Sequence, residues 1–394
     1  MKLHIAMSAA RDVDRAAREA VHEALRDARS PSFALAFCTD AYDPDALARA
    51  VTHELGEVPW AGCCSAGVFA GTTLVRQGVV VGVLEGDDAT YSVGVGGPVS
   101  ADPRAAGATA MREALAASRP GAAARHGRVH HGFLLFPDAL TGNAAEVIRG
   151  AVQESGAGAA WAGGGAGDNL RFVRTAQFAG GRAWHDAVVA VAIESAQPIA
   201  VGSRHGWRPY GPPTTVTSAH DVTVVELEYQ RAFEIYRRTA ADNGDEVDEQ
   251  RFAAFAMTHP LGIPQADGDH VIRDPLEVGP DGSLRCVGEV PEGAMVRVMH
   301  GDRHDLLVAA REAAVAARGE HRPPAGVLVF DCVSRALILG SAMERELEAI
   351  QEGIGLGIPM MGCLTLGEVG ALGTTAPQFQ NKTAVVMALP RAGA

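Results

Sequence analysis

Apolar runs and amphipathic stretches alternate along this chain, and their order repeats three times. Each passage has an apolar strand, a helix, an apolar strand that reaches a Phe near its end, a second helix, and a strand leading into a Gly-rich turn. Such self-similarity predicts one supersecondary unit used repeatedly. The first passage comprises LHIAMS, DVDRAAREAVHEALRDA, FALAFCTD, DPDALARAVTHELG and VPWAGCCSAG; the second YSVGVGG, DPRAAGATAMREALAAS, HGFLLFPD, NAAEVIRGAVQESG and AAWAGGGAG; the third MVRVMHG, DLLVAAREAAVAARG, AGVLVFDC, SAMERELEAIQEG and IPMMGCLTLG.

The helix boundaries carry recognisable end signals. Asp43 supplies an N-cap acceptor, Pro44 fits the first helical position, and Gly56 supplies a left-handed stop. Ser341 and Glu344 have the spacing of a capping box. These signals support helices between the strands, so we expect an α/β protein with mixed sheets covered by helices.

One region interrupts the repeat. Residues 208–290 hold a hairpin pattern, a short helix and the acidic segment ADNGDEVDEQ, which suits a surface loop. We place a domain boundary at the Pro- and Gly-rich junction near residue 215. Residues 1–214 would contain two repeated units. Residues 215–394 would contain the interrupting region, which is either an insertion or an altered copy of the unit, and then the third unit.

Composition narrows the class of protein. The 394 residues carry 34 basic and 47 acidic side chains, a net charge of −13, which disfavours binding to nucleic acids and anionic membranes. The six cysteines show no CxxC or metal-finger spacing, which indicates reduced thiols and a cytoplasmic protein. We expect no signal peptide and no membrane span, and we assign no cofactor, metal or catalytic residue.

The Gly-rich turns are the first candidate site. Their amides can converge on an anion, whereas the structural alternative is that glycine only permits close packing. Cys63 and Ser65 lie on the first turn, and Asp168 and Asn169 follow the second. Glu368 follows the third. A carboxylate there would suit the ammonium group of an amino acid, unless it only caps its own loop.

Two further motifs join this set. His205 and Trp207 flank a glycine and would donate to and stack on a ligand, or else anchor the domain junction. Cys332 ends an apolar strand three residues before Arg335. A thiol beside a cation can be an activated nucleophile, although a buried structural role is commoner for cysteine.

These motifs, in their order and spacing, resemble the FIST family over nearly the whole chain. The N-terminal match rests on GCCSAG, GVVVGVLEG, AGGGAGDN, DAVVAVAI and HGW. The C-terminal match rests on VTVVELEYQRAFEIY, FDCVSR, MGCLTLGEVG and QNKTAVVMAL, which adds Asn381 to the candidate ligand-binding residues. The resemblance implies a cytoplasmic sensory module of signal transduction that binds small ligands such as amino acids.

Two departures from the family pattern bear on function. The third turn has LTLGE where the family tends to be aromatic-rich, so the shape of the pocket can differ. No kinase, cyclase or methyl-accepting segment is apparent, so a sensor would report to a separate partner.

Two functions remain open. The first is a small-molecule sensor without chemistry of its own. The second is a three-repeat, amidohydrolase-like enzyme with a Cys or Ser nucleophile on a Gly-rich turn. For either we expect Glu368, Arg335 and Cys332 to face a cavity that His205 or Trp207 borders, with Arg335 gripping a ligand carboxylate. A buried Arg335–Glu368 ion pair is the structural alternative.

Overall fold

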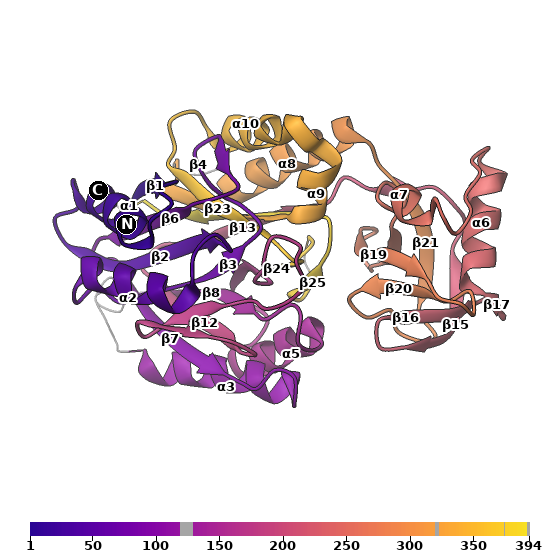
Figure 1. The fold of residues 1–394 in the computed structure, drawn as a ribbon, viewed down its shortest axis with the longest axis horizontal. Helices are drawn as coiled ribbons and strands as arrows, with labels where there is room; N and C mark the ends of the chain where they lie inside the picture. The colour runs from indigo at the N-terminus through magenta and orange to yellow at the C-terminus, as the bar shows by residue number, and fades with distance from the viewer. Residues whose placement is uncertain (119–128, 320–322, 374, 392–394) are drawn as a thin grey trace.

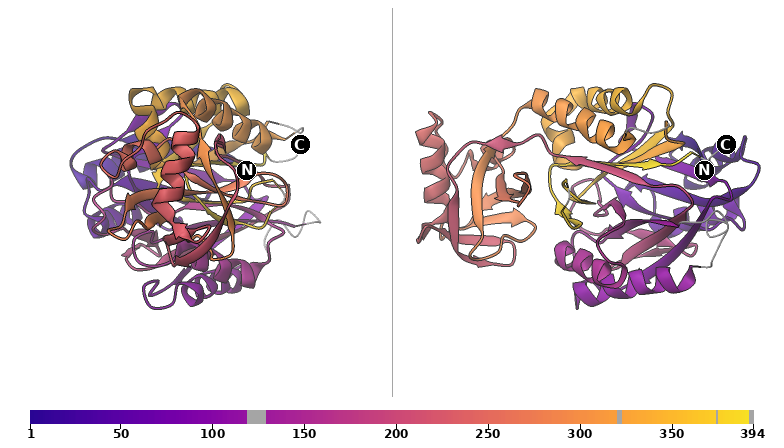
Figure 2. Two further views of the ribbon diagram at one scale, coloured as in Figure 1. Left: turned by 90° about the vertical axis from the view of Figure 1, so that its right-hand side faces the viewer. Right: turned by 180° about the vertical axis from the view of Figure 1, so that it is seen from behind.

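The computed structural model describes residues 1–118, 129–319, 323–373 and 375–391. It has mixed sheets and helices, as expected of an α/β protein. A large lobe holds both termini, and a small lobe made by residues 208–300 projects from it (Figures 1 and 2).

Three six-stranded sheets form the large lobe, and their strand orders correspond. The first has the order β1 (Lys2–Ser8), β6 (Val79–Glu85), β2 (Pro31–Thr39), β3 (Trp60–Ser65), β10 (Gln177–Ala179) and β11 (Arg182–Trp184). The second has β7 (Ala89–Gly96), β12 (Val188–Ser195), β8 (His130–Pro137), β9 (Ala160–Gly164), β24 (Glu368–Gly370) and β25 (Gln378–Gln380). The third has β13 (Ala200–Arg204), β26 (Ala384–Leu389), β22 (Gly326–Cys332), β23 (Met360–Thr365), β4 (Val68–Ala70) and β5 (Thr73–Val75).

In each sheet the third and fourth strands are parallel and the other neighbours are antiparallel. The last two strands come from a different passage of the sequence, so each passage lends its hairpin to a neighbouring sheet. Superposition of three equivalent units remains a prediction, as does the domain boundary near residue 215.

Helices cover the outer faces of these sheets, and several helix ends match their sequence signals. Asp43 accepts a hydrogen bond from the amide of Ala46 at the start of α2, and Gly56 ends that helix with a φ of 63°. The capping box at Ser341 is wrong, because α10 begins at Met343 with no side-chain cap. The helices of this lobe are α1 (Val13–Leu25), α2 (Pro44–Leu55), α3 (Pro103–Ala117), α5 (Ala144–Ser155), α8 (Arg303–Arg318), α9 (Val333–Leu339) and α10 (Met343–Ile354), with a 3-10 turn at Gly340–Ala342.

The centre of the large lobe is aromatic. Phe37, Phe136 and Phe330, from the third strand of each sheet, meet pairwise with ring centroids 5.6 to 5.8 Å apart. All three are fully buried. The apolar strands FALAF, GFLLF and GVLVF therefore occupy corresponding places around one core.

The small lobe is a separate β-structure inserted between β13 and α8. Strand β21 pairs with both β15 and β18, which closes the sheet on itself. The expected first strand of the third passage, MVRVMHG, is wrong: it forms β21 here, and β13 takes that place in the large lobe. The elements are β14 (Arg208–Pro209), β15 (Thr214–His220), β16 (Thr223–Leu227), β17 (Gln230–Arg231), α6 (Ala232–Asp242), α7 (Phe252–Ala256), β18 (Leu261–Pro264), β19 (His270–Val278), β20 (Leu284–Val287) and β21 (Met295–His300).

Candidate functional site

The three Gly-rich turns meet inside the large lobe and hydrogen-bond to one another. The amide of Gly165 donates to the carbonyl of Gly367 over 2.8 Å, and the amide of Gly167 donates to the carbonyl of Cys64 over 3.0 Å. These donors are occupied by neighbouring turns. The expected convergence on an anion is therefore wrong for these two amides, and close packing is the role that the structure supports.

A cavity of about 410 Å³ opens beside these turns, at the carboxyl ends of parallel strands β2 and β3. This position is where open α/β sheets most often bind ligands. We call it the strand-end cavity. Its lining consists of Cys38, Thr39, Asp40, Tyr42, Asp43, Pro44, Cys64, Asp168, Arg171, Val173, Arg174, Thr175 and His185.

Both signs of charge occur around the strand-end cavity. Arg171 and Arg174 come from the loop before β10, and Asp40 from the loop after β2. Arg171 Nη1 lies 3.1 Å from Asp40 Oδ2, but Arg171 is largely exposed, so water screens this pair. Arg174 contacts the ring of His185. The floor is buried and neutral, with Cys38, Thr39, Cys64 and Thr175.

Asp168 shapes one wall of the strand-end cavity. Its carboxylate accepts hydrogen bonds from the amides of Phe172, Val173 and Arg174, at 2.9, 2.6 and 3.1 Å. Asn169 is exposed and has a φ of 57°. These contacts match the capped-loop alternative for Asp168, while its contact with a ligand remains a prediction.

Cys63 and Ser65 point away from the strand-end cavity. Both are fully buried, and the thiol of Cys63 contacts that of Cys363 in the core. The hydroxyl of Ser65 donates to the carbonyl of Gly67 over 2.8 Å. A serine nucleophile needs a neighbouring base, and Ser65 instead bonds to main-chain groups.

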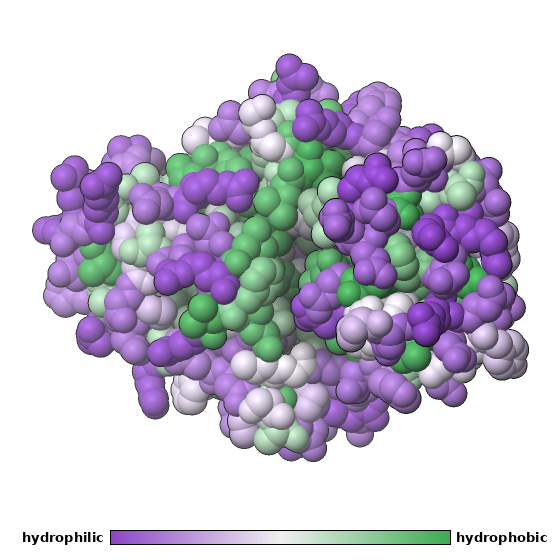
Figure 3. All heavy atoms as spheres, turned by 45° about the vertical axis from the view of Figure 1, so that its right-hand side comes forward, coloured by the Kyte–Doolittle hydropathy of each residue, from purple (hydrophilic) through white to green (hydrophobic). Residues whose placement is uncertain are grey.

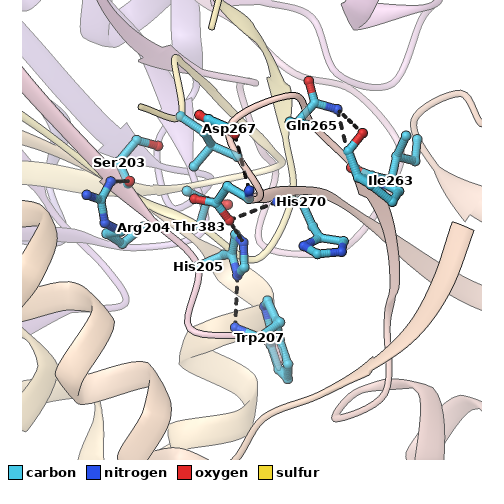
Figure 4. A network of polar contacts seen from close by, with 12 residues as sticks. Ser203, Arg204, His205, Trp207, Ile263, Gln265, Asp267, His270 and Thr383 are labelled. Atoms are coloured by element: carbon cyan, nitrogen blue, oxygen red, sulfur yellow. Dashed lines mark hydrogen bonds and ion pairs between the residues drawn. The ribbon is translucent and has the colours of Figure 1, made fainter. Parts of the chain in front are cut away.

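His205 and Trp207 belong to the junction of the two lobes (Figure 4). The Nδ1 of His205 accepts from the Trp207 amide over 2.8 Å, so its Nε2–H donates to Asp269 of the small lobe over 2.7 Å. Trp207 is 4% exposed, and its indole N–H donates to the carbonyl of Lys382 over 3.3 Å. This arrangement is that of a buried anchor.

A second cavity of about 380 Å³ borders His205, Trp207, Asp269 and the start of α8. In the surface view, an apolar band runs along the crease between the two lobes (Figure 3). Cys332, Arg335 and Glu368 belong to the lining of neither cavity. Their expected meeting with His205 at one cavity is therefore not found at these two.

Arg335 is fully buried, and each of its five N–H donors has an acceptor. Its Nε–H donates to Glu346 over 2.9 Å, and one Nη2–H donates to the same carboxylate. Its remaining donors reach the carbonyls of His205, Lys382 and Leu306 at 2.8, 3.1 and 2.9 Å. No donor is left for a ligand carboxylate, so Arg335 serves as a structural tie.

The structural alternative, an ion pair between Arg335 and Glu368, is also wrong, because Arg335 pairs with Glu346 and Asp331 instead. Arg335 Nε lies 3.2 Å from Asp331 Oδ1. Burial, with the neighbouring Glu346 charge, raises the pKa of Asp331 well above its ordinary value.

Glu368 lies nearby in a different environment. Its Oε1 accepts from the hydroxyl of Thr365 over 2.8 Å, and its Oε2 from the amide of Thr383 over 3.2 Å. Cys332 Sγ lies 3.3 Å from Ser334 Oγ. The side-chain oxygen of Asn381 is buried and has no hydrogen-bond partner among the described residues.

The family models agree with the motifs. A model of the FIST N domain matches residues 32–230, and a model of the FIST C domain matches residues 232–371. The chain belongs to the FIST family. FIST domains are small-ligand sensory domains of signal transduction.

Relatives of known sequence or structure add little about activity. Two uncharacterised proteins, from two strains of Mycobacterium tuberculosis, are 31% identical over 192 residues, which covers 46% of this chain and 49% of theirs. The chain thus spans about half the length of these curated relatives. A cyanuric acid hydrolase from A. caulinodans aligns at 12% identity and a TM-score of 0.33 over 99% of both chains. T. maritima PurL complexed with ADP aligns at 11% identity and a TM-score of 0.23, over 98% of this chain and 71% of that one.

Two features are absent from the described part of this FIST protein. None of its described helices is both long and apolar enough to cross a membrane. Within the described residues, no group of three or more His, Cys, Asp or Glu side chains is arranged to hold a metal ion.

The sequence analysis missed several residues that the FIST fold places at the junction of the lobes or in the strand-end cavity. Lys382 is fully buried, and its Nζ lies 3.0 Å from Asp274 Oδ2 and donates to the Met257 carbonyl over 3.1 Å. It thereby links the lobes. Arg171 and Arg174 stand beside the chosen Asp168, and their spacing in DNLRFVR was the available signal.

The stability of this FIST protein should fall between about pH 4.5 and pH 8 through Glu368. Burial raises the pKa of Glu368 from 4.5 to about 8. A carboxyl whose pKa is raised on folding stabilises the protein fully below pH 4.5 and loses that contribution as the pH rises through about 8. Urea unfolding from pH 6 to 9 should show this decline in the wild type and a shallower one in Glu368→Gln. Equal slopes in both proteins would contradict the assignment.

Proposed function

We propose that this protein is a cytoplasmic sensor that binds a small carboxylate or amino-acid-like ligand in the strand-end cavity. It would report occupancy to a separate output protein. The observation that carries the proposal is the charge pattern of this cavity, with Arg171 and Arg174 on one wall and Asp40 on another. A zwitterion presents both charges, and such polar groups fix ligand orientation in otherwise neutral pockets.

Each part of the cavity then has a role. Arg174 would hold the ligand carboxylate, because its planar guanidinium can make two parallel hydrogen bonds to it. Asp40 would hold an ammonium group after its contact with Arg171 opens. Asp168 would act through the loop, since its three accepted amides fix the backbone of Phe172, Val173 and Arg174.

Among the residues that the structure describes, no specific contact favours the amidohydrolase-like alternative. Cys63 and Ser65 lie in the core without a neighbouring base. Cys332 contacts Ser334, and burial raises the pKa of this thiol to about 12. A thiol with so high a pKa carries almost no thiolate at neutral pH and is a poor nucleophile.

A thermal-shift screen tests the proposal. The probes are the amino acids and a set of small mono- and dicarboxylates. Each compound that stabilises the protein is then recovered, and mass spectrometry shows whether it is unchanged. A ligand at a hundred times its Kd adds about 2.7 kcal/mol to the free energy of unfolding. Arg174→Gln should lose most of this stabilisation while the unliganded protein melts as before.

Arg26→Gln is the matched control, because Arg26 is an exposed arginine at the end of α1 and outside the cavity lining. It should respond to ligands like the wild type. Equal stabilisation of Arg174→Gln and wild type would place binding elsewhere, and a compound consumed during the assay would indicate an enzyme.

A further inference from the structure

Two cysteines form the innermost wall of the strand-end cavity. Cys38 and Cys64 are each the last residue but one of their strands, β2 and β3, and the two residues are direct partners in the parallel register. Adjacent strands run about 4.8 Å apart, and directly paired residues point to the same face of the sheet. The two thiols therefore stand side by side.

Both thiols are buried in the wall of the strand-end cavity. Cys38 is 2% and Cys64 5% exposed, and both belong to its lining. The thiol of Cys64 accepts a hydrogen bond from the amide of Ala176 over 2.8 Å. Cys63, one residue earlier, faces the opposite side of the sheet and contacts Cys363 in the core. Of these two neighbouring pairs, only one opens to the outside.

The chemistry of this pair favours reagents that take both sulfurs together. Burial raises the pKa of Cys38 well above its ordinary value, and burial with the neighbouring thiol Cys63 raises that of Cys64. Because both pKa values are raised, few of these thiols are ionised at neutral pH, and a reagent that reacts with a single thiolate reacts slowly. An ion that binds both sulfurs displaces both protons, since metal and thiolate binding are linked to proton release.

We propose that Cys38 and Cys64 form a dithiol site for a soft, thiophilic ion that accepts two thiolates, such as a trivalent arsenical or a two-coordinate soft metal ion. The cationic side chains of Arg171 and Arg174 on the rim would offset the negative charge of two thiolates. This site goes beyond the proposed sensing of carboxylates and does not depend on it.

Phenylarsine oxide is the probe, because it requires two neighbouring thiols. Its As=O oxygen leaves as water with the two thiol protons, two As–S bonds form, and arsenic stays trivalent, so no electrons are exchanged. Native mass spectrometry of the wild type should show one arsenical per chain without any added carboxylate. A dithiol should remove it readily, while an equal concentration of monothiol should not.

Variants locate the site. Cys38→Ser and Cys64→Ser should each bind the arsenical at least about a hundredfold more weakly, because the second sulfur otherwise binds intramolecularly. Cys286→Ser, which removes a buried thiol of the small lobe, should bind like the wild type. Thermal melts of all four proteins establish that the serine variants are folded. Absence of binding to the wild type, or retention by Cys38→Ser, would overturn the proposal, as would adducts mapped to Cys63 and Cys363.

Discussion

Arg335→Met should lower the free energy of unfolding by roughly 3–5 kcal/mol, the typical cost of removing one partner from a buried ion pair. The substitution leaves the carboxylate of Glu346 without its cation in a fully buried site. It also leaves the carbonyls of His205, Lys382 and Leu306 without the guanidinium N–H groups from which they accept hydrogen bonds. Urea unfolding followed by circular dichroism measures the change.

Two related variants separate the charge from the hydrogen bonds. Arg335→Lys should recover part of the loss, because it restores the charge but not the planar fork of donors. Glu346→Gln should cost less than Arg335→Met, because the guanidinium keeps a second acid, Asp331, 3.2 Å from Nε. Arg112→Met breaks an exposed pair with Glu154 and should leave the unfolding midpoint close to that of the wild type. A similar small effect for Arg335→Met would contradict its role as a structural tie.

Gly62→Ala should destabilise the fold even more severely. A Cβ at Gly62 would stand 1.7 Å from the carbonyl oxygen of Ala36 on the neighbouring strand, which is backbone and cannot rotate away. The cost should exceed the roughly 1–3 kcal/mol of ordinary overpacking. We expect little folded protein in a thermal melt.

Gly158→Ala is the control for this substitution. Nothing lies within 4 Å of a Cβ at Gly158, and its φ is outside the range that disfavours side chains. Its melting temperature should match or slightly exceed that of the wild type, since alanine restricts the unfolded chain. A stable, cooperatively melting Gly62→Ala protein would show that β2 and β3 can separate without loss of structure.

The sequence was informative where a residue's role depends on its own strand or helix. The Phe-bearing strands FALAF, GFLLF and GVLVF were recognised, and Phe37, Phe136 and Phe330 form one aromatic centre. Local pattern was misleading for MVRVMHG, because a short apolar run has the same appearance in either lobe. The strand that takes its place, β13, is shorter and lies at the edge of the third sheet.

The sequence pattern could not predict which residues far apart in the chain contact each other. Arg335 and Glu368 were matched because both stand at strand ends, yet the acid that Arg335 contacts is Glu346 on helix α10. Likewise, Cys63 was chosen from the Cys63–Cys64 pair. Alternation along a strand makes one of two neighbours face the cavity, but only the register with β2 identifies Cys64 as that one.

The exchange of hairpins has a consequence for how this chain can be divided. Hairpin β4–β5 completes the third sheet and hairpin β24–β25 completes the second, so each end of the sequence finishes a layer begun by the other. Cutting near residue 215 would strip both layers of their outer strands and expose hydrogen-bonding edges that invite aggregation. The two family regions are thus divisions of the sequence that share one interlocked body. The small lobe, by contrast, closes its sheet on itself and contributes no strand to these layers, so its removal would leave their strand order intact.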